Sequence, residues 1–113
     1  MPMTRLLLTV LAALSTAAAR AQSPQDFLRD CEIFAIAESK RDGGSLKSVR
    51  IARGDSLIEN RFDRKIGGVH VSTEYLGRAQ FIDDGGARNA AFVCLHSGVG
   101  KKPVYFVEVL IGQ

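Results

Sequence analysis

The chain of 113 residues contains two cysteines, Cys31 and Cys94, and their pairing limits the folds open to the chain more than any other feature. An even number of cysteines in an exported chain favours a disulfide, and this one would enclose about sixty residues. A loop of that length gives roughly 4 kcal/mol of stabilisation in the chain-entropy model. We therefore predict a Cys31–Cys94 disulfide that joins an early part of the chain to a late one.

Cys94 lies in the stretch "AAFVCLHS", two residues before His96, and in a strand these two side chains point to the same side. The rise of a strand places them roughly 6–7 Å apart, beyond hydrogen-bond reach, and neither a thiol-protease signature nor a C-x-x-C motif occurs. A zinc site made of the two cysteines, His70 and His96 lacks the short paired spacing of zinc modules. We therefore expect no catalytic thiol, no metal and no cofactor, and a partly exposed His96 at a strand end.

Residues 1–21 have the pattern of a signal peptide. Arg5 provides a positive charge before the apolar run 6–14, and Ala19, Arg20 and Ala21 form an A-x-A cleavage motif. Cleavage after Ala19 and a buried alanine-rich helix are the alternatives for this segment. The apolar run is too short to span a membrane, and no later stretch reaches ~20 apolar residues. We therefore expect an exported protein, periplasmic or secreted, that does not span a membrane and has one domain over residues 22–113.

The charge of the expected mature chain argues against nucleic-acid binding. The whole sequence has 15 Lys and Arg against 12 Asp and Glu, a net charge of +3. Removal of Arg5 and Arg20 leaves 13 against 12, a net charge of about +1, and the basic residues are scattered rather than clustered. A domain of this size buries only a modest core, so a covalent crosslink is a substantial part of its stability.

The segment 23–44 has the pattern of an amphipathic helix. Ser23 suits the N-cap, Pro24 the first helical position, and the glycines at 43 and 44 the end of the helix. The apolar stripe comprises Phe27, Leu28, Cys31, Phe34, Ala35 and Ile36, and the residues mainly on the solvent side are Arg29, Asp30, Glu32 and Lys40. Cys31 therefore lies on the face that packs against the rest of the protein.

Alternating apolar and polar residues predict antiparallel strands after this helix. Residues 69–84 alternate over a long run, with Gly77 as a bend or bulge, and residues 83–86 form a hairpin turn. The runs 88–96 and 103–111 are two further strands, joined by a glycine-containing loop, and residues 45–53 form a short strand. Residues 55–66 fit a strand, which we favour, or a helix that begins at Ser56 with Glu59 completing a capping box. The sequence thus predicts an α+β fold, with one N-terminal helix packed on a four- to five-stranded antiparallel sheet.

The last two predicted strands are apolar on both faces, and only one face can lie under the helix. Cys94 is on one face, while Val93 and Leu95 lie on the other. The candidates for covering this second face are internal curling of the sheet, which we favour, the segment 58–62, a second copy of the chain or a partner. The candidate interaction residues are Val93, Leu95, His96, Lys101 and Lys102.

The stretches "GGVHVSTEYLGRAQF", "FVCLHSG" and "KKPVYFVEVL", with a cysteine in the first helix, resemble small exported proteobacterial proteins of unknown function. These are of a Burkholderia type and include a seroreactive exported protein. The resemblance covers roughly residues 69–110 and contains no catalytic motif. It implies an exported single-domain protein with a helix on an antiparallel sheet, of immunogenic character, and it assigns no functional residue.

These features favour binding over catalysis. The first expectation is a periplasmic or secreted interaction protein, a monomer or weak homodimer, that binds a protein or an envelope component. The alternative is an inhibitor or immunity-type protein that blocks another protein, for which the basic loop containing Lys101 and Lys102 is the candidate contact.

A small hydrolase or thiol enzyme is the less favoured alternative. His70 and Glu74 share the polar face of one strand, but the strand rise separates them by more than roughly 10 Å. Glu108 lies on a mostly apolar face, where we expect it to pair with an arginine such as Arg78 or Arg88. We therefore expect no enzyme activity.

Overall fold

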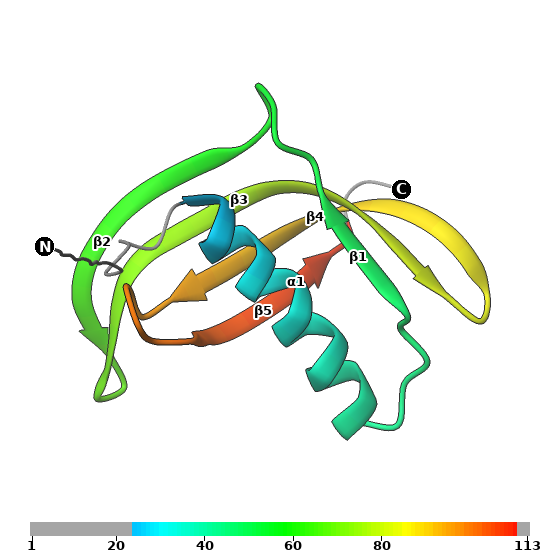
Figure 1. The fold of residues 1–113 in the computed structure, drawn as a ribbon, viewed down its shortest axis with the longest axis horizontal. Coiled ribbons are helices and arrows are strands. Elements are labelled where there is room, and N and C mark those ends of the chain that lie inside the picture. Colours follow the sequence, from blue (N-terminus) through cyan, green and yellow to red (C-terminus); the bar gives the residue numbers. More distant parts are fainter. Residues whose placement is uncertain (1–23, 111–113) are drawn as a thin grey trace, which may run out of the picture.

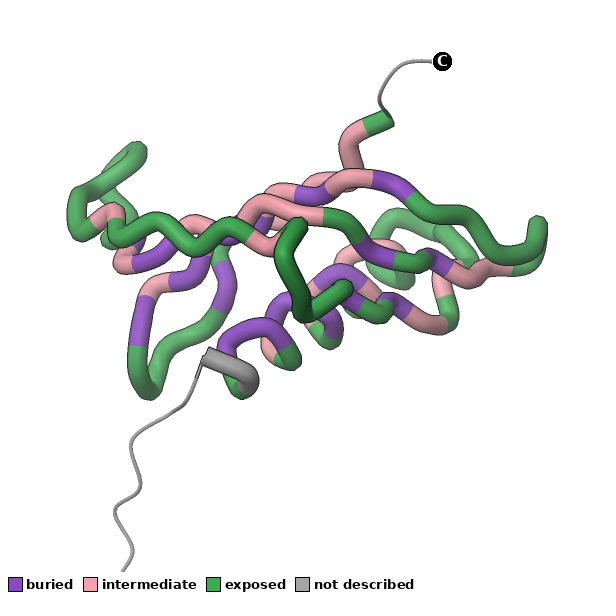
Figure 2. The backbone as a smooth tube through the Cα atoms, turned by 90° about the horizontal axis from the view of Figure 1, so that it is seen from above, coloured by how far each residue is buried: buried purple, intermediate pink, exposed green. Residues whose placement is uncertain are grey.

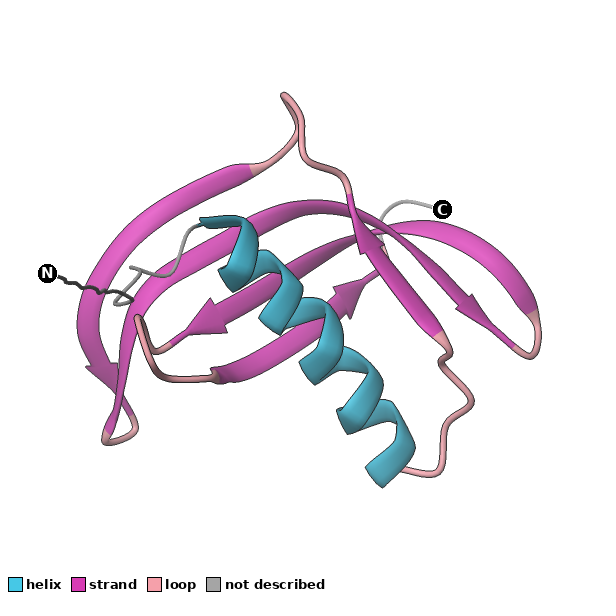
Figure 3. Cartoon of the chain, viewed as in Figure 1, coloured by secondary structure: helices cyan, strands magenta, loops and turns pink. Residues whose placement is uncertain are grey.

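The computed structural model describes residues 24–110, so the predicted signal peptide 1–21 and the predicted N-cap Ser23 lie outside the described residues. One helix and five strands follow in the order α1 (Pro24–Arg41), β1 (Ser48–Ile51), β2 (Ile58–Ile66), β3 (Val69–Asp83), β4 (Gly86–His96) and β5 (Pro103–Val109). The helix lies across one face of a curved antiparallel sheet (Figures 1 and 3). The predicted α+β architecture is confirmed.

β3 is the strand on which the sheet is organised, because it pairs with three others. Residues 73–83 of β3 pair with β4 along one edge, and along the other edge β3 pairs first with β2 and then with β1. The change of partner occurs at Gly77, between Leu76 opposite Ile58 and Ala79 opposite Ile51. The order across the sheet is therefore β1-β3-β4-β5, with β2 beside β1 on the same edge of β3.

Gly77 is not a bulge in the ladder with β4, since the register between β3 and β4 runs unbroken through its pairing with Phe92. The glycine instead permits a close approach. A Cβ atom at this position would lie 3.3 Å from Leu57 Cδ1 and 3.3 Å from Phe92 Cε1. Absence of a side chain therefore lets the segment before β2 pack down onto the sheet where β3 changes partner.

The core lies between α1 and the inner face of the sheet, and burial alternates along the long strands (Figure 2). From α1, Phe27, Leu28, Cys31 and Ala35 are buried, as the predicted stripe requires. The sheet contributes Val49, Ile51, Tyr75, Ala79, Phe81, Ala90, Phe92 and Cys94. Successive strand residues point to opposite faces, so these residues share the side that faces the helix.

A disulfide between Cys31 and Cys94 joins the buried stripe of α1 to β4, with the two Cα atoms 6.2 Å apart. Both cysteines are fully buried. The predicted pairing is confirmed, and within the described residues no cysteine remains as a thiol.

Residues 58–66 form a strand rather than a helix. β2 pairs with the first half of β3, and its register shifts between Arg61 and Arg64, where two residues oppose Ser72 alone. Asp63 sits in this bulge with a φ of 47°. Hairpin formation with β3 supplies partners for the backbone of this segment, and a helix here would leave that half of β3 without a neighbour.

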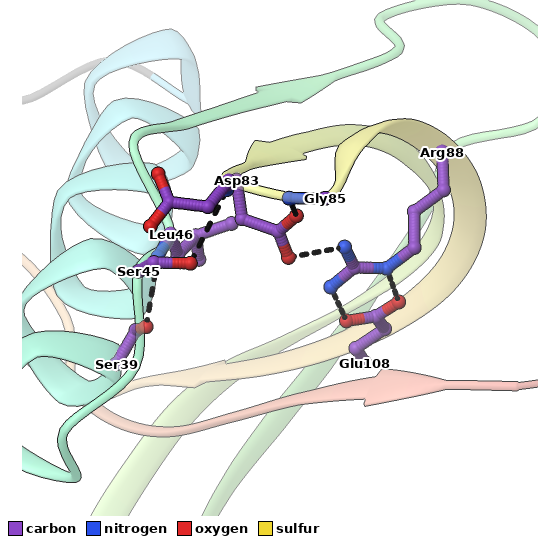
Figure 4. A network of polar contacts seen from close by, with 8 residues as sticks. Ser39, Ser45, Leu46, Asp83, Gly85, Arg88 and Glu108 are labelled. Atoms are coloured by element: carbon purple, nitrogen blue, oxygen red, sulfur yellow. Dashed lines mark hydrogen bonds and ion pairs between the residues drawn. The ribbon is translucent and has the colours of Figure 1, made fainter.

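An ionic cluster ties the β3–β4 turn to β5 (Figure 4). The Arg88 guanidinium donates to both carboxylate oxygens of Glu108 at 2.7 Å and to Asp83 Oδ2 at 2.6 Å. Hydrogen bonding from Arg88 and from the Gly85 amide lowers the pKa of the Asp83 carboxyl. The expected pairing of Glu108 with an arginine is thus confirmed, and Arg88 is the arginine.

Candidate functional site

His96 is fully buried, which corrects the expectation of a partly exposed residue available for interaction. It lies at the end of β4 on the same face as Cys94, and this face is covered by the first turns of α1. Its ring stacks on Phe27, with 4.1 Å between the ring centroids. Nε2 of His96 lies 2.8 Å from Oδ2 of Asp30. His96 is therefore a core residue that connects the sheet to the helix.

The hydrogen bonds of His96 define its protonation. The Gly98 backbone N–H donates to Nδ1 at 2.9 Å, so Nδ1 is an acceptor and the ring proton resides on Nε2, which donates to Asp30. Both ring nitrogens of His96 therefore have hydrogen-bond partners. The hydroxyl of Thr73, the residue opposite His96 on β3, lies 3.0 Å from the Ser72 hydroxyl and not against the ring nitrogens. This arrangement positions a loop and a helix; it does not present the imidazole as a base to a hydroxyl nucleophile.

The loop 97–102 is fixed at its base and exposed at its tip. Besides the Gly98–His96 bond, the Ser97 hydroxyl donates to the His70 carbonyl at 2.7 Å. The Lys101 N–H donates to the Gly98 carbonyl at 2.9 Å. Gly98 itself has a φ of 121°, a conformation that a side chain disfavours. Lys101 and Lys102 are exposed, and the Ser97 N–H donates to the Lys102 carbonyl at 3.1 Å.

Val93 and Leu95 lie on the outer face of the sheet, opposite the helix, as their position in the alternation predicts. The register pairs Val93 with Val107 and Leu95 with Tyr105 on β5. We call Val93, Leu95, Tyr105, Val107 and Val109 the outer patch. Its members are half-buried or exposed, and α1 packs on the other side (Figure 2).

An apolar cleft adjoins the outer patch where the β2–β3 hairpin curls towards β5. Its volume is about 320 Å³. Leu95 and Tyr105 of the outer patch contribute to its wall, and the remaining lining residues are Ile66, Val69, Val71 and Val104. The cleft thus shares Leu95 and Tyr105 with the outer patch.

A second, smaller cavity of about 260 Å³ lies between the start of α1, β2 and the loop 97–102. Tyr75, Thr73, Glu59 and Arg61 line it, and Phe27 contributes an aromatic ring. The Tyr75 hydroxyl is buried and has no hydrogen-bond partner within residues 24–110. Burial, reinforced by the negative charge of Glu59, raises the pKa of Tyr75 to about 12.

Glu32 is buried, although the helical pattern assigned it to the solvent side of α1. Its carboxylate accepts the Ile51 N–H and an Arg53 N–H, each at 2.8 Å. Arg53 also donates to the Ile51 carbonyl. Glu32 thus satisfies the backbone at the outer edge of β1, a role that depends on where β1 passes the helix and has no signature in the sequence.

The residues considered for a zinc site are used elsewhere. Cys31 and Cys94 are joined to each other, and His96 is bonded to Asp30 and Gly98. Over the described range, no three His, Cys, Asp or Glu side chains are grouped as metal ligands. α1, the one helix among these residues, is not long and apolar enough to cross a membrane.

Comparison of the chain with models of known protein families, with curated protein sequences and with solved structures finds no match.

Proposed function

We propose that the chain is a small exported, disulfide-stabilised interaction protein that binds a partner protein or an envelope component through the outer patch and the adjoining cleft. The observation that carries this proposal is the contrast between the two faces of the sheet. The inner face is covered by α1, whereas the outer patch is covered by no element of residues 24–110. Contiguous apolar surface of this kind is characteristic of interaction sites.

The composition of this surface supports protein recognition. Tyr105, half exposed, supplies an aromatic ring with a polar tip, and Val93 and Leu95 supply aliphatic area beside it. Aromatic and aliphatic side chains at the centre of an interface, beside a pocket that accepts an anchor, are typical of binding surfaces. The cleft beside Leu95 and Tyr105 provides such a pocket.

Export is part of the proposal and rests on two features. Residues 1–21 have the order of charge, apolar run and small residues that signal peptides have. The Cys31–Cys94 disulfide is of a kind that persists in oxidising compartments. We propose the periplasm or the medium as the location.

The second candidate function is inhibition of another protein by the loop 97–102. The observation that favours it is the anchoring of the loop base by the buried His96, because a fixed loop loses little entropy when it binds. Val99 at the tip is 64% exposed and would be the inserted side chain.

One experiment separates the two functions. Residues 22–113 are purified with the disulfide formed, and partners are captured from an envelope fraction with wild type, Leu95→Glu and Val99→Glu in parallel. A partner retained by wild type and Val99→Glu, and reduced at least about tenfold by Leu95→Glu, supports the outer patch. The converse pattern supports the loop. Absence of any partner sensitive to either variant contradicts both functions.

A further inference from the structure

Three described strands, β1, β2 and β5, pair with one strand only, and two of them are protected against pairing with another strand. β1 is only four residues long, and its exposed backbone is occupied by the Glu32 and Arg53 side chains. β2 carries five charged residues, Glu59, Arg61, Asp63, Arg64 and Lys65, and is interrupted by the bulge at Asp63. Short length, charges and bulges are the usual means by which proteins block an edge strand.

β5 lacks these protections beyond its first residue, Pro103. Its sequence is PVYFVEV, and the charge of Glu108 is already paired with Arg88. From Tyr105 to Val109 its register with β4 is regular. α1 crosses the inner face of β5 in the layer beside the sheet and continues past its open edge (Figure 1). A regular apolar edge strand of this kind is a template for a further strand.

The direction of the backbone groups on β5 follows from the ladder. The Ala52 N–H donates to the Arg78 carbonyl, so the backbone of residue 78 faces β1 and that of Gly77 faces β4. Gly77 pairs with Phe92, so the backbone N–H and C=O of Phe92 point to β3. Successive residues of a strand point these groups to opposite edges, so those of Val93 point to β5. It follows that residues 105, 107 and 109 bond to β4, while the N–H and C=O groups of residues 104, 106 and 108 point to the open edge.

We propose that β5 pairs antiparallel with β5 of a second copy of the chain, about a two-fold axis at Val107. This register places Phe106 opposite residue 108 of the other copy as a mutually hydrogen-bonded pair, in agreement with the direction of their backbone groups. It also places Tyr105 opposite Val109, so that the outer patches of the two copies become one surface.

The apolar residues at the two ends of the β5 pairing indicate that the strand added to the open edge of β5 comes from a second copy of the chain. Leu110 is 75% exposed and Val104 is 37% exposed. Pairing about Val107 puts Leu110 of each copy opposite Val104 of the other, so both are covered by the same contact. A two-fold interface is self-complementary, so a second copy of β5 places apolar residues at both of these positions. An unrelated peptide would need apolar residues at the same two positions. This inference goes beyond the proposed function. The two share residues of β5, among them Val104 and Tyr105, but the pairing uses the backbone edge of the strand, whereas the proposed function uses side chains of the outer patch and the cleft.

Cysteine crosslinking tests the axis. In a non-hydrogen-bonded antiparallel pair the two Cα atoms lie ~4.5 Å apart, a separation that a disulfide accepts. Val107→Cys is therefore expected to form a covalent dimer under mild oxidation of the folded protein. Tyr105→Cys is the matched control, because the two positions 105 would be roughly 13 Å apart in this register. Crosslinking of Tyr105→Cys as efficiently as Val107→Cys would overturn the proposal.

Sedimentation at increasing protein concentration tests the association without an added cysteine. We expect wild type to shift from monomer to dimer and Leu110→Lys to require at least about tenfold more protein for the same dimer fraction, because a lysine would face Val104 at the edge. Val99→Lys makes a similar change at another exposed apolar residue and is expected to behave as wild type. A wild type that stays monomeric throughout, or equal effects of the two lysines, contradicts the proposal. Either result leaves the binding of a partner by the outer patch to be judged by its own experiment.

Discussion

Asp30 and His96 join the helix to the sheet beside the point where the disulfide joins them. Asp30 directly precedes Cys31 in α1, and His96 follows Cys94 by two positions in β4, so the 2.8 Å hydrogen bond and the covalent bond are neighbours. The covalent bond fixes the distance between the two elements, and the hydrogen bond with the Phe27 stack fixes how the end of β4 lies under the helix.

Replacement of His96 by alanine is expected to lower the free energy of unfolding by about 2–4 kcal/mol. The change removes a fully buried ring, its stack on Phe27 and the acceptor of the Gly98 N–H. Urea unfolding at neutral pH measures the effect. His70→Ala, at an exposed histidine of the same sheet, is the control and should change stability by less than about 0.5 kcal/mol. Equal effects of the two substitutions would contradict the role assigned to His96.

Removal of the disulfide is expected to lower the free energy of unfolding by roughly 4 kcal/mol, because the bond closes a long loop in the unfolded chain. The double variant Cys31→Ala/Cys94→Ala and the reduced wild type should show similar losses in denaturant unfolding, since both lack the closed loop. A wild type whose midpoint is unchanged by reduction would contradict the expectation. Mass spectrometry with a thiol-specific label should detect no free thiol in the protein purified without reducing agent.

Alkaline pH is expected to destabilise the protein through Tyr75. Its pKa is about 12 in the folded protein and about 10 when unfolded, so the unfolded chain releases the phenolic proton first. The stability that this difference provides is complete below pH 10 and is lost as pH rises towards 12, by ~2 kcal/mol. Tyr75→Phe lacks the titration, so its stability should fall less over this range.

The same variant tests the hydroxyl at neutral pH. Because the Tyr75 hydroxyl has no protein partner within the described residues, its removal should leave stability unchanged or raise it by up to about 1 kcal/mol. A loss above about 1 kcal/mol in Tyr75→Phe would indicate that the hydroxyl is hydrogen-bonded in the folded protein.

Gly77→Ala is expected to lower the free energy of unfolding by about 1–3 kcal/mol, since its Cβ would press on Leu57 and Phe92 at 3.3 Å. Gly54→Ala is the matched control. Nothing lies within 4 Å of the Cβ position at Gly54, and its φ is not positive, so alanine there should be neutral or slightly stabilising. Thermal or urea unfolding of the pair measures the difference, and a neutral Gly77→Ala would show that Leu57 can move aside.

The elements with strong periodicity could be predicted from the sequence, and so could their covalent link. The alternation along residues 69–84 predicts β3, and the structure buries Val71, Tyr75 and Phe81 on the predicted face. The glycine-containing turn at 83–86 predicts that β4 follows as the second strand of a hairpin. Residues 58–66 were less certain because charged residues dominate them and their strand conformation is supplied by pairing with β3.

The parts that could not be predicted depend on how the helix crosses the sheet. Local patterns place Glu32 and Asp30 on the polar side of the helix, yet β1 passes Glu32 and the end of β4 reaches Asp30. Likewise, nothing in the stretch around His96 shows that Phe27 and the start of α1 lie over it. Crossing angle and position are set by the whole packing arrangement, and a single-sequence pattern does not encode them.

The closed covalent ring runs from residue 31 to residue 94 and includes β1, β2, β3 and most of β4, but it leaves β5 outside. β5 is held by its ladder with β4, by α1 on its inner face, by Phe106 against Phe81 and Phe92, and by the Arg88–Glu108 pair. Detachment of this last strand therefore opens no part of the ring, so β5 can separate from the sheet while the crosslink stays intact.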